Sequence, residues 1–187
     1  MLSSLNDLRP VALPSAVMRV CERVVLCKLD SLVKDYIDPL QFAYRRNRCI
    51  DDAISYVLEN IYSHLEKAGS SVRLMFFDFS GAFNTIQPHF LVQKLLNMKL
   101  PSTVISWIFD YLTNRLHYVR LNGVLSYVIC TNIGAPQGTV LAPFLFSLYT
   151  ADCRSTDESC LLVKFADDTK MIGKICNDED ALHRKKN

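Results

Sequence analysis

The fold is decided by residues 160–175, which read CLLVKFADDTKMIGKI. Two largely apolar runs flank the pair Asp167-Asp168, and this pattern predicts a strand, a turn and a second strand. Aspartate is common in turns because its carboxylate bonds nearby backbone amides. For the dipeptide taken alone, this structural role is favoured over a functional one by roughly two to one.

A second apolar run, Val72–Phe79, reads VRLMFFDF and carries one carboxylate, Asp78, near its end. A continuous apolar run of this length predicts a strand buried on both faces. If this strand lies beside the 160–175 hairpin in one sheet, Asp78 and Asp167-Asp168 converge at one edge. Mg²⁺ is usually held by one or two carboxylates together with substrate phosphates, and two such ions suit a displacement at phosphorus.

The remaining patterns predict mainly helices. Ser15 is a plausible N-cap for a helix to about Lys34, whose apolar side would hold Val17, Val20, Cys21, Val24, Leu29, Leu32 and Val33. Further helices are expected from Asp51-Asp52 to before Gly69, over 88–98, over 101–112 and over 140–150, the last being either a helix or a buried apolar segment. Asn122-Gly123 marks a hairpin over 117–131. The predicted class is α+β, with helices packed on an antiparallel sheet.

Composition limits the function classes. The 187 residues include 21 Lys and Arg against 19 Asp and Glu, a net charge of +2, so any basic surface must be local. The seven cysteines are scattered without a C-x-x-C pair, which argues against a zinc site. The longest nearly apolar stretch, 140–151, is too short to span a bilayer, and no secretory signal is visible. We therefore expect a soluble, intracellular protein with reduced thiols and no membrane partner.

Five segments together resemble the motifs of one enzyme family. FADD at 165–168 resembles the F/Y-x-D-D turn of reverse transcriptases, and FDFSGAF at 77–83 resembles their D-x-x-x-A-F/Y palm motif. GAPQGTVLAP at 134–143 resembles the P-Q-G motif, while RPVAL at 9–13 and QFAYR at 41–45 resemble finger motifs. All five occur in the family's order across almost the whole chain, and the set is most similar to non-LTR, LINE-type retrotransposon enzymes.

The resemblance implies a role for each matching residue at the reaction centre. Asp78 and Asp167 match the metal-binding catalytic pair, Asp168 matches its less strictly required neighbour, and the backbone at Phe79 can also coordinate metal. Phe83 matches the aromatic residue that excludes a 2′-hydroxyl, because a rigid ring leaves room for hydrogen only. Outside the motif, Phe83 would be read as an ordinary core residue.

Further matching residues would contact substrates. The implied nucleotide-binding residues are Arg9, Phe79, Gly81, Ala82, Phe83, Gln137 and Gly138. A glycine such as Gly138 permits close backbone approach. Arg45, Arg46 and Arg48, with Phe42 and Tyr44 between them, would suit template phosphates and base stacking, although a charge run is usually a solvated face.

The resemblance also implies cofactors, partners and organisation. We expect two Mg²⁺ ions, with Mn²⁺ as an alternative, and an RNA template, a DNA primer and deoxynucleoside triphosphates as partners. Residues 1–70 would form a partial fingers subdomain and residues 71–187 the palm. Nineteen residues follow Asp168, too few for a thumb, so thumb and endonuclease regions are expected in a full-length parent. The family further implies the nucleus, with no clear targeting signal in this sequence.

Two alternatives stay open at this stage. The chain could be an inactive retrotransposon remnant that binds nucleic acid or protein. It could also be a polymerase of another class, such as one that makes RNA on an RNA template.

Overall fold

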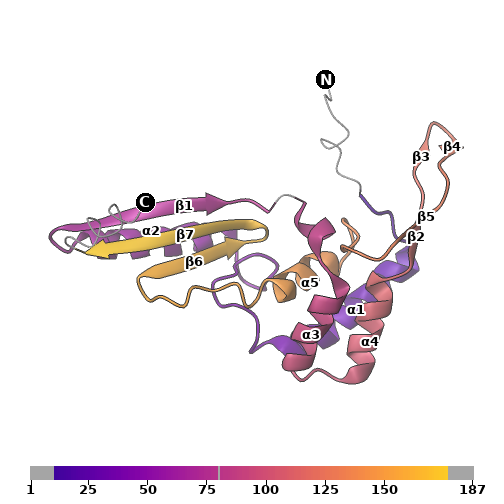
Figure 1. Cartoon of the computed structure of the whole chain (residues 1–187), viewed down its shortest axis with the longest axis horizontal. Helices are drawn as coiled ribbons and strands as arrows, with labels where there is room; N and C mark the ends of the chain where they lie inside the picture. The colour runs from indigo at the N-terminus through magenta and orange to yellow at the C-terminus, as the bar shows by residue number, and fades with distance from the viewer. Residues whose placement is uncertain (1–10, 80, 177–187) are drawn as a thin grey trace. The chain divides into compact units, whose positions relative to one another are not determined.

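The predicted strand–turn–strand forms in the computed structural model, which describes residues 11–79 and 81–176. Strands β6 (Cys160–Phe165) and β7 (Asp168–Cys176) pair antiparallel around a two-residue turn. Strand β1 (Ser70–Phe77) pairs with the other side of β7, which gives the order β1-β7-β6 (Figure 1). The α+β class with an antiparallel sheet and packed helices is therefore confirmed.

By its internal contacts the chain divides into two units. The sheet unit consists of residues 37–79 and 150–176, and the helical unit consists of residues 11–36 and 81–149, within the described ranges. The predicted division into fingers (1–70) and palm (71–187) remains a prediction.

Helix α2 (Ile50–Leu65) covers one face of the sheet. Its Ala53 and Val57 form a buried cluster with Phe42, Val163 and Ile172. At its start the Asp52 carboxylate accepts a 2.7 Å hydrogen bond from the Cys49 amide, and this bond lowers the pKa of Asp52. Asp52 therefore acts as a helix cap, as the sequence indicates for an acidic first turn.

The prediction that the β1 run is buried on both faces is wrong. Leu74, Met75, Phe76 and Phe77 are all exposed, Phe76 by 68%. Strand β1 lies at the edge of the sheet, and α2 is the one helix that the described part of the sheet unit contains. One apolar face of β1 thus has no helix of this unit over it, and the strand still pairs along its whole length with β7.

The helical unit contains α1 (Ala16–Val33), the 3₁₀ helix η2 (Ala82–Thr85), α3 (Pro88–Asn97), α4 (Ser102–Leu112) and α5 (Ala142–Tyr149). Helix α3 packs against α4 and α5. The Ser15 hydroxyl accepts from the Met18 amide, which confirms the predicted N-cap. Among the residues described, no helix has the length and apolarity needed to cross a membrane.

The predicted apolar side of α1 is only partly correct. Leu29 and Val33 are fully buried, but Val17, Val20 and Val24 are exposed by more than half. The side chain buried nearer the start of the helix is the carboxylate Glu22. Hydrogen-bond partners on other elements, which periodicity along one helix does not reveal, allow this burial.

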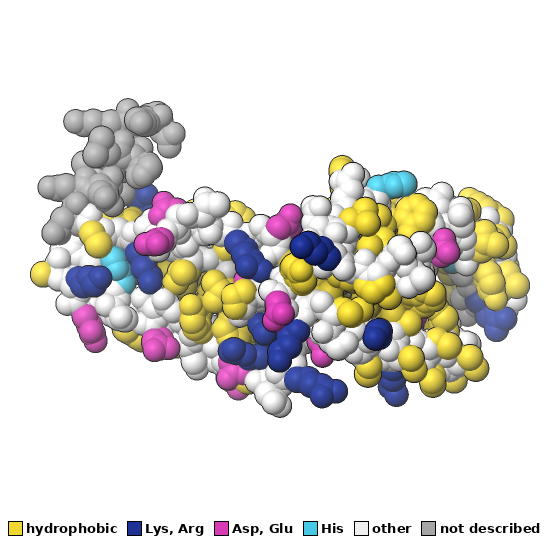
Figure 2. Space-filling view, turned by 90° about the horizontal axis from the view of Figure 1, so that it is seen from below, with side chains coloured by type: hydrophobic (Ala, Val, Ile, Leu, Met, Phe, Trp, Pro, Cys, Tyr) yellow, Lys and Arg dark blue, Asp and Glu magenta, His cyan; other side chains and the backbone are white. Residues whose placement is uncertain are grey.

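The hairpin around Asn122-Gly123 is confirmed. It is built from β3 (Arg120–Leu121) and β4 (Val124–Leu125), and its base from β2 (Arg115–His117) and β5 (Ile129–Thr131). Asn122 and Gly123 both have positive φ, at 50° and 82°, as a type I′ turn requires. Figure 2 shows many hydrophobic side chains at the surface, and those of this hairpin are among the exposed ones.

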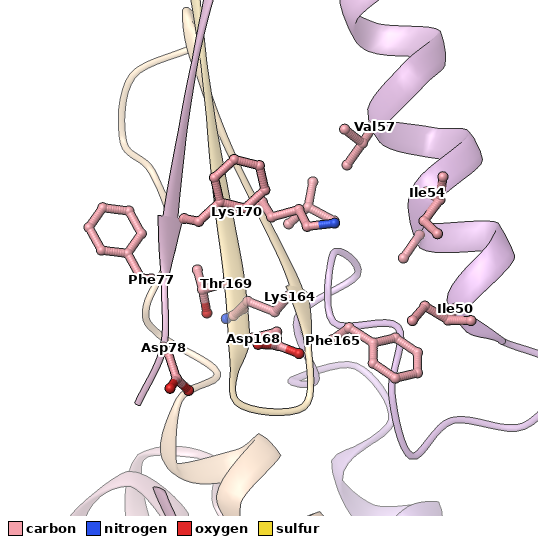
Figure 3. Close-up of a pocket in the computed structure, with 13 residues that line it drawn as sticks. Ile50, Ile54, Val57, Phe77, Asp78, Lys164, Phe165, Asp168, Thr169 and Lys170 are labelled. Atoms are coloured by element: carbon pink, nitrogen blue, oxygen red, sulfur yellow. The ribbon is translucent and has the colours of Figure 1, made fainter. Parts of the chain in front are cut away.

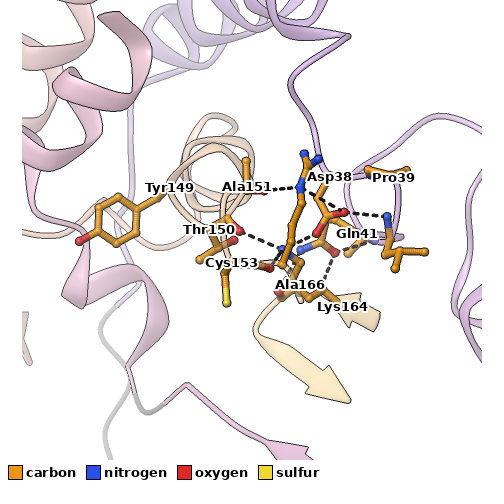
Figure 4. Close-up of polar contacts among 12 residues, drawn as sticks. Asp38, Pro39, Gln41, Tyr149, Thr150, Ala151, Cys153, Lys164 and Ala166 are labelled. Atoms are coloured by element: carbon orange, nitrogen blue, oxygen red, sulfur yellow. Dashed lines mark hydrogen bonds and ion pairs between the residues drawn. The ribbon is translucent and has the colours of Figure 1, made fainter. Parts of the chain in front are cut away.

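A buried ion pair holds β6 to the chain segment before α2. The Lys164 ammonium lies 2.6 Å from an Asp38 carboxylate oxygen and donates to the carbonyls of Thr150 and Cys153, each at 2.9 Å (Figure 4). Lys164 and Asp38 are 1% and 2% exposed. The ion pair offsets the cost of placing each charge out of water.

We expect Lys164→Met to lower the free energy of unfolding by about 3–5 kcal/mol, because the buried Asp38 carboxylate loses its closer cation and keeps only Arg154, whose Nε lies 3.7 Å away. Urea denaturation of the chain measures this loss. The double variant Lys164→Met/Asp38→Asn, which removes both charges, should recover most of it. An equal loss in the single and double variants would contradict the pairing.

Candidate active site

Two of the three candidate carboxylates are set opposite each other by strand register. Phe77 and Thr169 are the last pair of β1 and β7, and the same register continued by one residue would set Asp78 opposite Asp168. Side chains alternate between faces along a strand, and directly opposite residues share a face. Asp78 and Asp168 therefore lie on the same side of the sheet, as Figure 3 shows at the end of β1 and the start of β7.

Both carboxylates line one pocket of about 280 Å³ between α2 and the end of the sheet. Its other walls are largely apolar and come from α2 (Ile50, Ala53, Ile54, Val57), β1 (Phe76, Phe77) and the hairpin (Val163, Lys164, Phe165, Thr169, Lys170). In Figure 3, Phe77 is directed away from α2, while Ile50, Ile54 and Val57 come from that helix. The pocket is therefore acidic at the end of the sheet and largely apolar along α2.

Asp167 occupies the turn between the two strands and is half-buried. The negative charge of Asp167 acts on Tyr44: burial, and secondly this charge, raise the pKa of the Tyr44 phenol. Tyr44 lies in the QFAYR segment, so this segment and the turn approach each other within the sheet unit. Phe79, which follows Asp78, is 37% exposed and lies outside any helix or strand.

These residues fit a hard divalent cation in part. Aspartate oxygens are the ligand type that Mg²⁺ prefers, and two of them line one pocket. Within the described ranges, however, no group of three or more His, Cys, Asp or Glu side chains is close enough to hold a metal ion. These side chains alone would supply only part of the oxygen ligands that such an ion takes.

In the helical unit, the GAPQG segment is fixed to the residues around Phe83. The Ala135 amide donates to the Phe83 carbonyl at 2.7 Å, and the Gly134 amide donates to the Ile86 carbonyl at 2.6 Å. The Phe83 ring packs against Phe146 of α5, with ring centroids 5.7 Å apart. Gly81 precedes η2 with a φ of 67°, and Ala82 is buried in η2.

The segment that follows Arg9 lies against Gln137 and Gly138. The Ala12 amide donates to the Gln137 carbonyl at 2.7 Å. A Cβ on Gly138 would lie 2.7 Å from the Val11 side chain and 3.2 Å from the Ala12 carbonyl oxygen, and the φ of 87° also favours glycine. Arg9 itself lies outside the described residues.

The buried carboxylate of Glu22 holds the start of α5. It accepts a 2.6 Å hydrogen bond from the Val140 amide and a 3.4 Å bond from the Leu141 amide. The Tyr111 hydroxyl lies 3.2 Å from Glu22 and 3.0 Å from the Thr139 hydroxyl. Burial is the main reason that the pKa of Tyr111 lies far above its usual range. Glu22 therefore fixes the residues directly after the P-Q-G sequence.

The candidate arginines have different surroundings. The Arg45 guanidinium donates to the carbonyls of Asp38, Pro39 and Gln41. Arg48 lies over the Phe42 ring, 5.1 Å from its centroid, and Arg46 is exposed. The expectation that Phe42 stacks on bases is wrong, because Phe42 is 2% exposed and belongs to the core cluster.

Sequence reasoning assigned no buried polar role to Glu22, Asp38, Gln41 and Lys164, which are among the buried polar residues of the two units. One signal was available: Lys164 interrupts the apolar run LLVKFA, and a charge inside a strand of this kind needs a partner. The identity of the partner, Asp38, depends on the fold.

Comparison with known proteins places the chain among polymerases. Residues 3–185 match a family profile described as "Reverse transcriptase (RNA-dependent DNA polymerase)". The chain is 30% identical over 182 residues to a probable RNA-directed DNA polymerase from transposon X-element of Drosophila melanogaster. It is 24% identical over 181 residues to the RNA-directed DNA polymerase from mobile element jockey of the same species. In each case 92% of the chain aligns with 20% of the relative, so the chain spans about a fifth of their length.

Solved structures show the same fold. An apo telomerase from Candida tropicalis, truncated from its C-terminal domain, matches with a TM-score of 0.58 and 15% identity, over 90% of this chain and 36% of that one. Telomerase from Candida albicans, in complex with a fragment of telomeric RNA, matches with a TM-score of 0.59 and 13% identity, over 88% and 30%.

We expect Gly134→Ala to destabilise the helical unit more than Gly123→Ala does. Both glycines have positive φ, which costs any other residue about 1–2 kcal/mol. At Gly134 a Cβ would also lie 2.9–3.0 Å from backbone atoms of Asn84 and Phe83, whereas at Gly123 it meets open space. This clash should add about 1–3 kcal/mol in urea denaturation. Equal losses would show that the GAPQG segment does not pack on the Phe83 backbone.

Proposed function

The chain belongs to the reverse transcriptase family, and from this premise we propose that it supplies the catalytic centre of an RNA-directed DNA polymerase of a LINE-type retrotransposon. The observation that supports the proposal is the pairing of β1 with β7, at whose end Asp78 and Asp168 line one pocket, next to the turn that holds Asp167. The reaction is the addition of a deoxynucleotide to a DNA 3′-hydroxyl, with an RNA strand as template. The 3′-oxygen bonds to the α-phosphorus, and pyrophosphate leaves.

Asp78, Asp167 and Asp168 would hold the divalent ions, with the Phe79 backbone as a further ligand. Held there, Mg²⁺, or Mn²⁺ in its place, would supply positive charge to offset that of the phosphates and of the attacking and leaving oxygens. The carboxylates need no proton of their own in this role. They would provide negative charge at a fixed position, because they lie at the end of a hydrogen-bonded sheet.

The other residues would select and orient substrates. Phe83 would limit the space at the sugar 2′-position, and Gln137 and Gly138 would pack against the incoming nucleotide and template. Arg9, with the backbone at Phe79, Gly81 and Ala82, would lie against the triphosphate. Arg45, Arg46 and Arg48 would serve the template strand. The RNA template, the DNA primer and a nuclear location belong to this proposal, which draws on the family and on the telomerase relative whose structure includes RNA.

We expect primer extension on an RNA template with Mg²⁺, and we expect Asp167→Asn to abolish it. Losing a metal ligand should cost more than the about 10–100-fold that losing an outer-shell partner costs. The rate of deoxynucleotide incorporation is the measurement, and Asp110→Asn, in α4 of the helical unit, serves as the matched control. Wild-type activity no greater than that of Asp167→Asn would remove the enzymatic proposal. Salt-dependent RNA binding, indifferent to Mg²⁺ and to Asp167→Asn, would then favour the inactive remnant.

We further expect Phe83→Ala to lower the preference for deoxynucleotides over ribonucleotides by about tenfold or more, because it opens space at the sugar. The ratio of kcat/KM values for the two substrates is the readout. Phe90→Ala, an exposed phenylalanine on α3 of the same unit, should leave the ratio unchanged. A wild-type chain without any deoxy preference would instead support an enzyme that makes RNA.

A further inference from the structure

The turn that carries Asp167 has an unusual backbone. Ala166, the first of its two residues, has a φ of 59°, in the left-handed region that residues with a Cβ adopt only at a conformational cost. A positive φ at the first position is typical of a type II′ hairpin turn, which normally has glycine there. Something in the surrounding structure must therefore stabilise Ala166 in this conformation.

The side chain of Gln41 binds both backbone polar groups of Ala166. Its Oε1 accepts from the Ala166 amide at 3.1 Å, and its Nε2 donates to the Ala166 carbonyl at 3.2 Å (Figure 4). The same Oε1 also accepts from the Ala43 amide at 3.1 Å. Only one orientation of the amide makes all three bonds, because Oε1 cannot donate and Nε2 cannot accept. Gln41 is 1% exposed, so these bonds are protected from water.

Gln41 is itself held rigidly against β6. The Phe42 amide donates to the Lys164 carbonyl at 2.9 Å, and the Lys164 amide donates to the Leu40 carbonyl at 2.8 Å. Residues 40–42 thus bracket Lys164 like a short parallel strand. The Lys164–Asp38 ion pair fixes the same segment from its other end. The amide that binds the turn is therefore attached to the sheet at several points.

We propose that Gln41 is a positioning residue for the catalytic turn: it holds Ala166 in the left-handed conformation and thereby sets the direction of the Asp167 carboxylate. Gln41 touches neither substrate nor metal in this role. It acts through the backbone of the residue next to Asp167. The inference rests on the proposed function for its effects on metal binding and catalysis, whereas the effect on the turn is measured independently of it.

Two variants separate positioning from simple stability. Gln41→Met keeps the side-chain size and removes all three hydrogen bonds, and Ala166→Gly removes the penalty for positive φ. The matched control is Ile172→Val, which removes one methyl group from the core of β7 without touching the turn. Gln41→Glu keeps the acceptor and loses the donor to Ala166, and it serves if Gln41→Met does not fold.

The first readout is amide hydrogen exchange at Ala166 by NMR. We expect the Ala166 amide to exchange at least tenfold faster in Gln41→Met and to show a smaller increase in rate in Gln41→Glu. In Ile172→Val its exchange rate should rise no more than those of the other β7 amides. The second readout is Mn²⁺ affinity by titration with Mn²⁺ alone. The Mn²⁺ affinity should fall at least fivefold in Gln41→Met. In the double variant Gln41→Met/Ala166→Gly, more than half of this loss, measured as the logarithm of the affinity, should be restored.

Unchanged Ala166 exchange in both Gln41 variants would overturn the proposal. So would Mn²⁺ affinity that falls equally in Gln41→Met and Ile172→Val, because Gln41 would then act on stability alone. Failure of the wild-type chain to extend a primer would count against the proposed function only, since neither readout depends on catalysis.

Discussion

Antiparallel pairing of β1 with β7 is the interaction on which the candidate site depends. Eight consecutive residue pairs, from Ser70 with Cys176 to Phe77 with Thr169, fix the register. A slip by one residue would send the Asp78 side chain to the other face of the sheet. Two carboxylates far apart in sequence therefore line one pocket because of backbone hydrogen bonding along a whole strand.

The sheet unit places its polar groups in two distinct environments. Asp78 and Asp168 are exposed at the sheet end, where solvent and a ligand can reach them. Asp38, Gln41 and Lys164 are nearly fully buried: Lys164 pairs with Asp38, and the Gln41 amide donates to the Asp38 carbonyl. Buried polar groups of this kind must be satisfied within the protein, so they hold the segments that carry them in one arrangement. Asp78 and Asp168 are thus open to a ligand, whereas Asp38, Gln41 and Lys164 stay in fixed contacts.

Much of this arrangement could be predicted from local sequence. The hairpin over residues 160–175, the Asn122-Gly123 turn and the Ser15 cap all depend on short-range chemistry, and each is present. The prediction that Asp78 lies near the 160–175 hairpin required that β1 lie beside this hairpin in one sheet. The sheet order β1-β7-β6 fulfils this requirement. Candidate roles for Phe83, Gln137 and Gly138 came from family resemblance, and their assignment stays a prediction.

What local sequence could not predict depends on contacts between distant segments. The β1 run was expected to be buried because continuous apolar strands usually lie inside a sheet, yet β1 is at the edge. Periodicity along α1 does not predict that the charged side chain of Glu22 is buried. The amides of Val140 and Leu141, which make this burial possible, lie more than a hundred residues away in the sequence. Gln41 begins the QFAYR segment, but its partner cannot be predicted from sequence because Gln41 binds the backbone of Ala166 and not its side chain.

The register of β1 on β7 is open to direct measurement in isotope-labelled protein by cross-strand nuclear Overhauser effects. We expect backbone contacts between Phe77 and Thr169 and between Met75 and Met171, which continue toward Asp78 and Asp168. Contacts shifted by one or two residues, or the absence of any contact between the two strands, would contradict it, because the carboxylates would then have no common site.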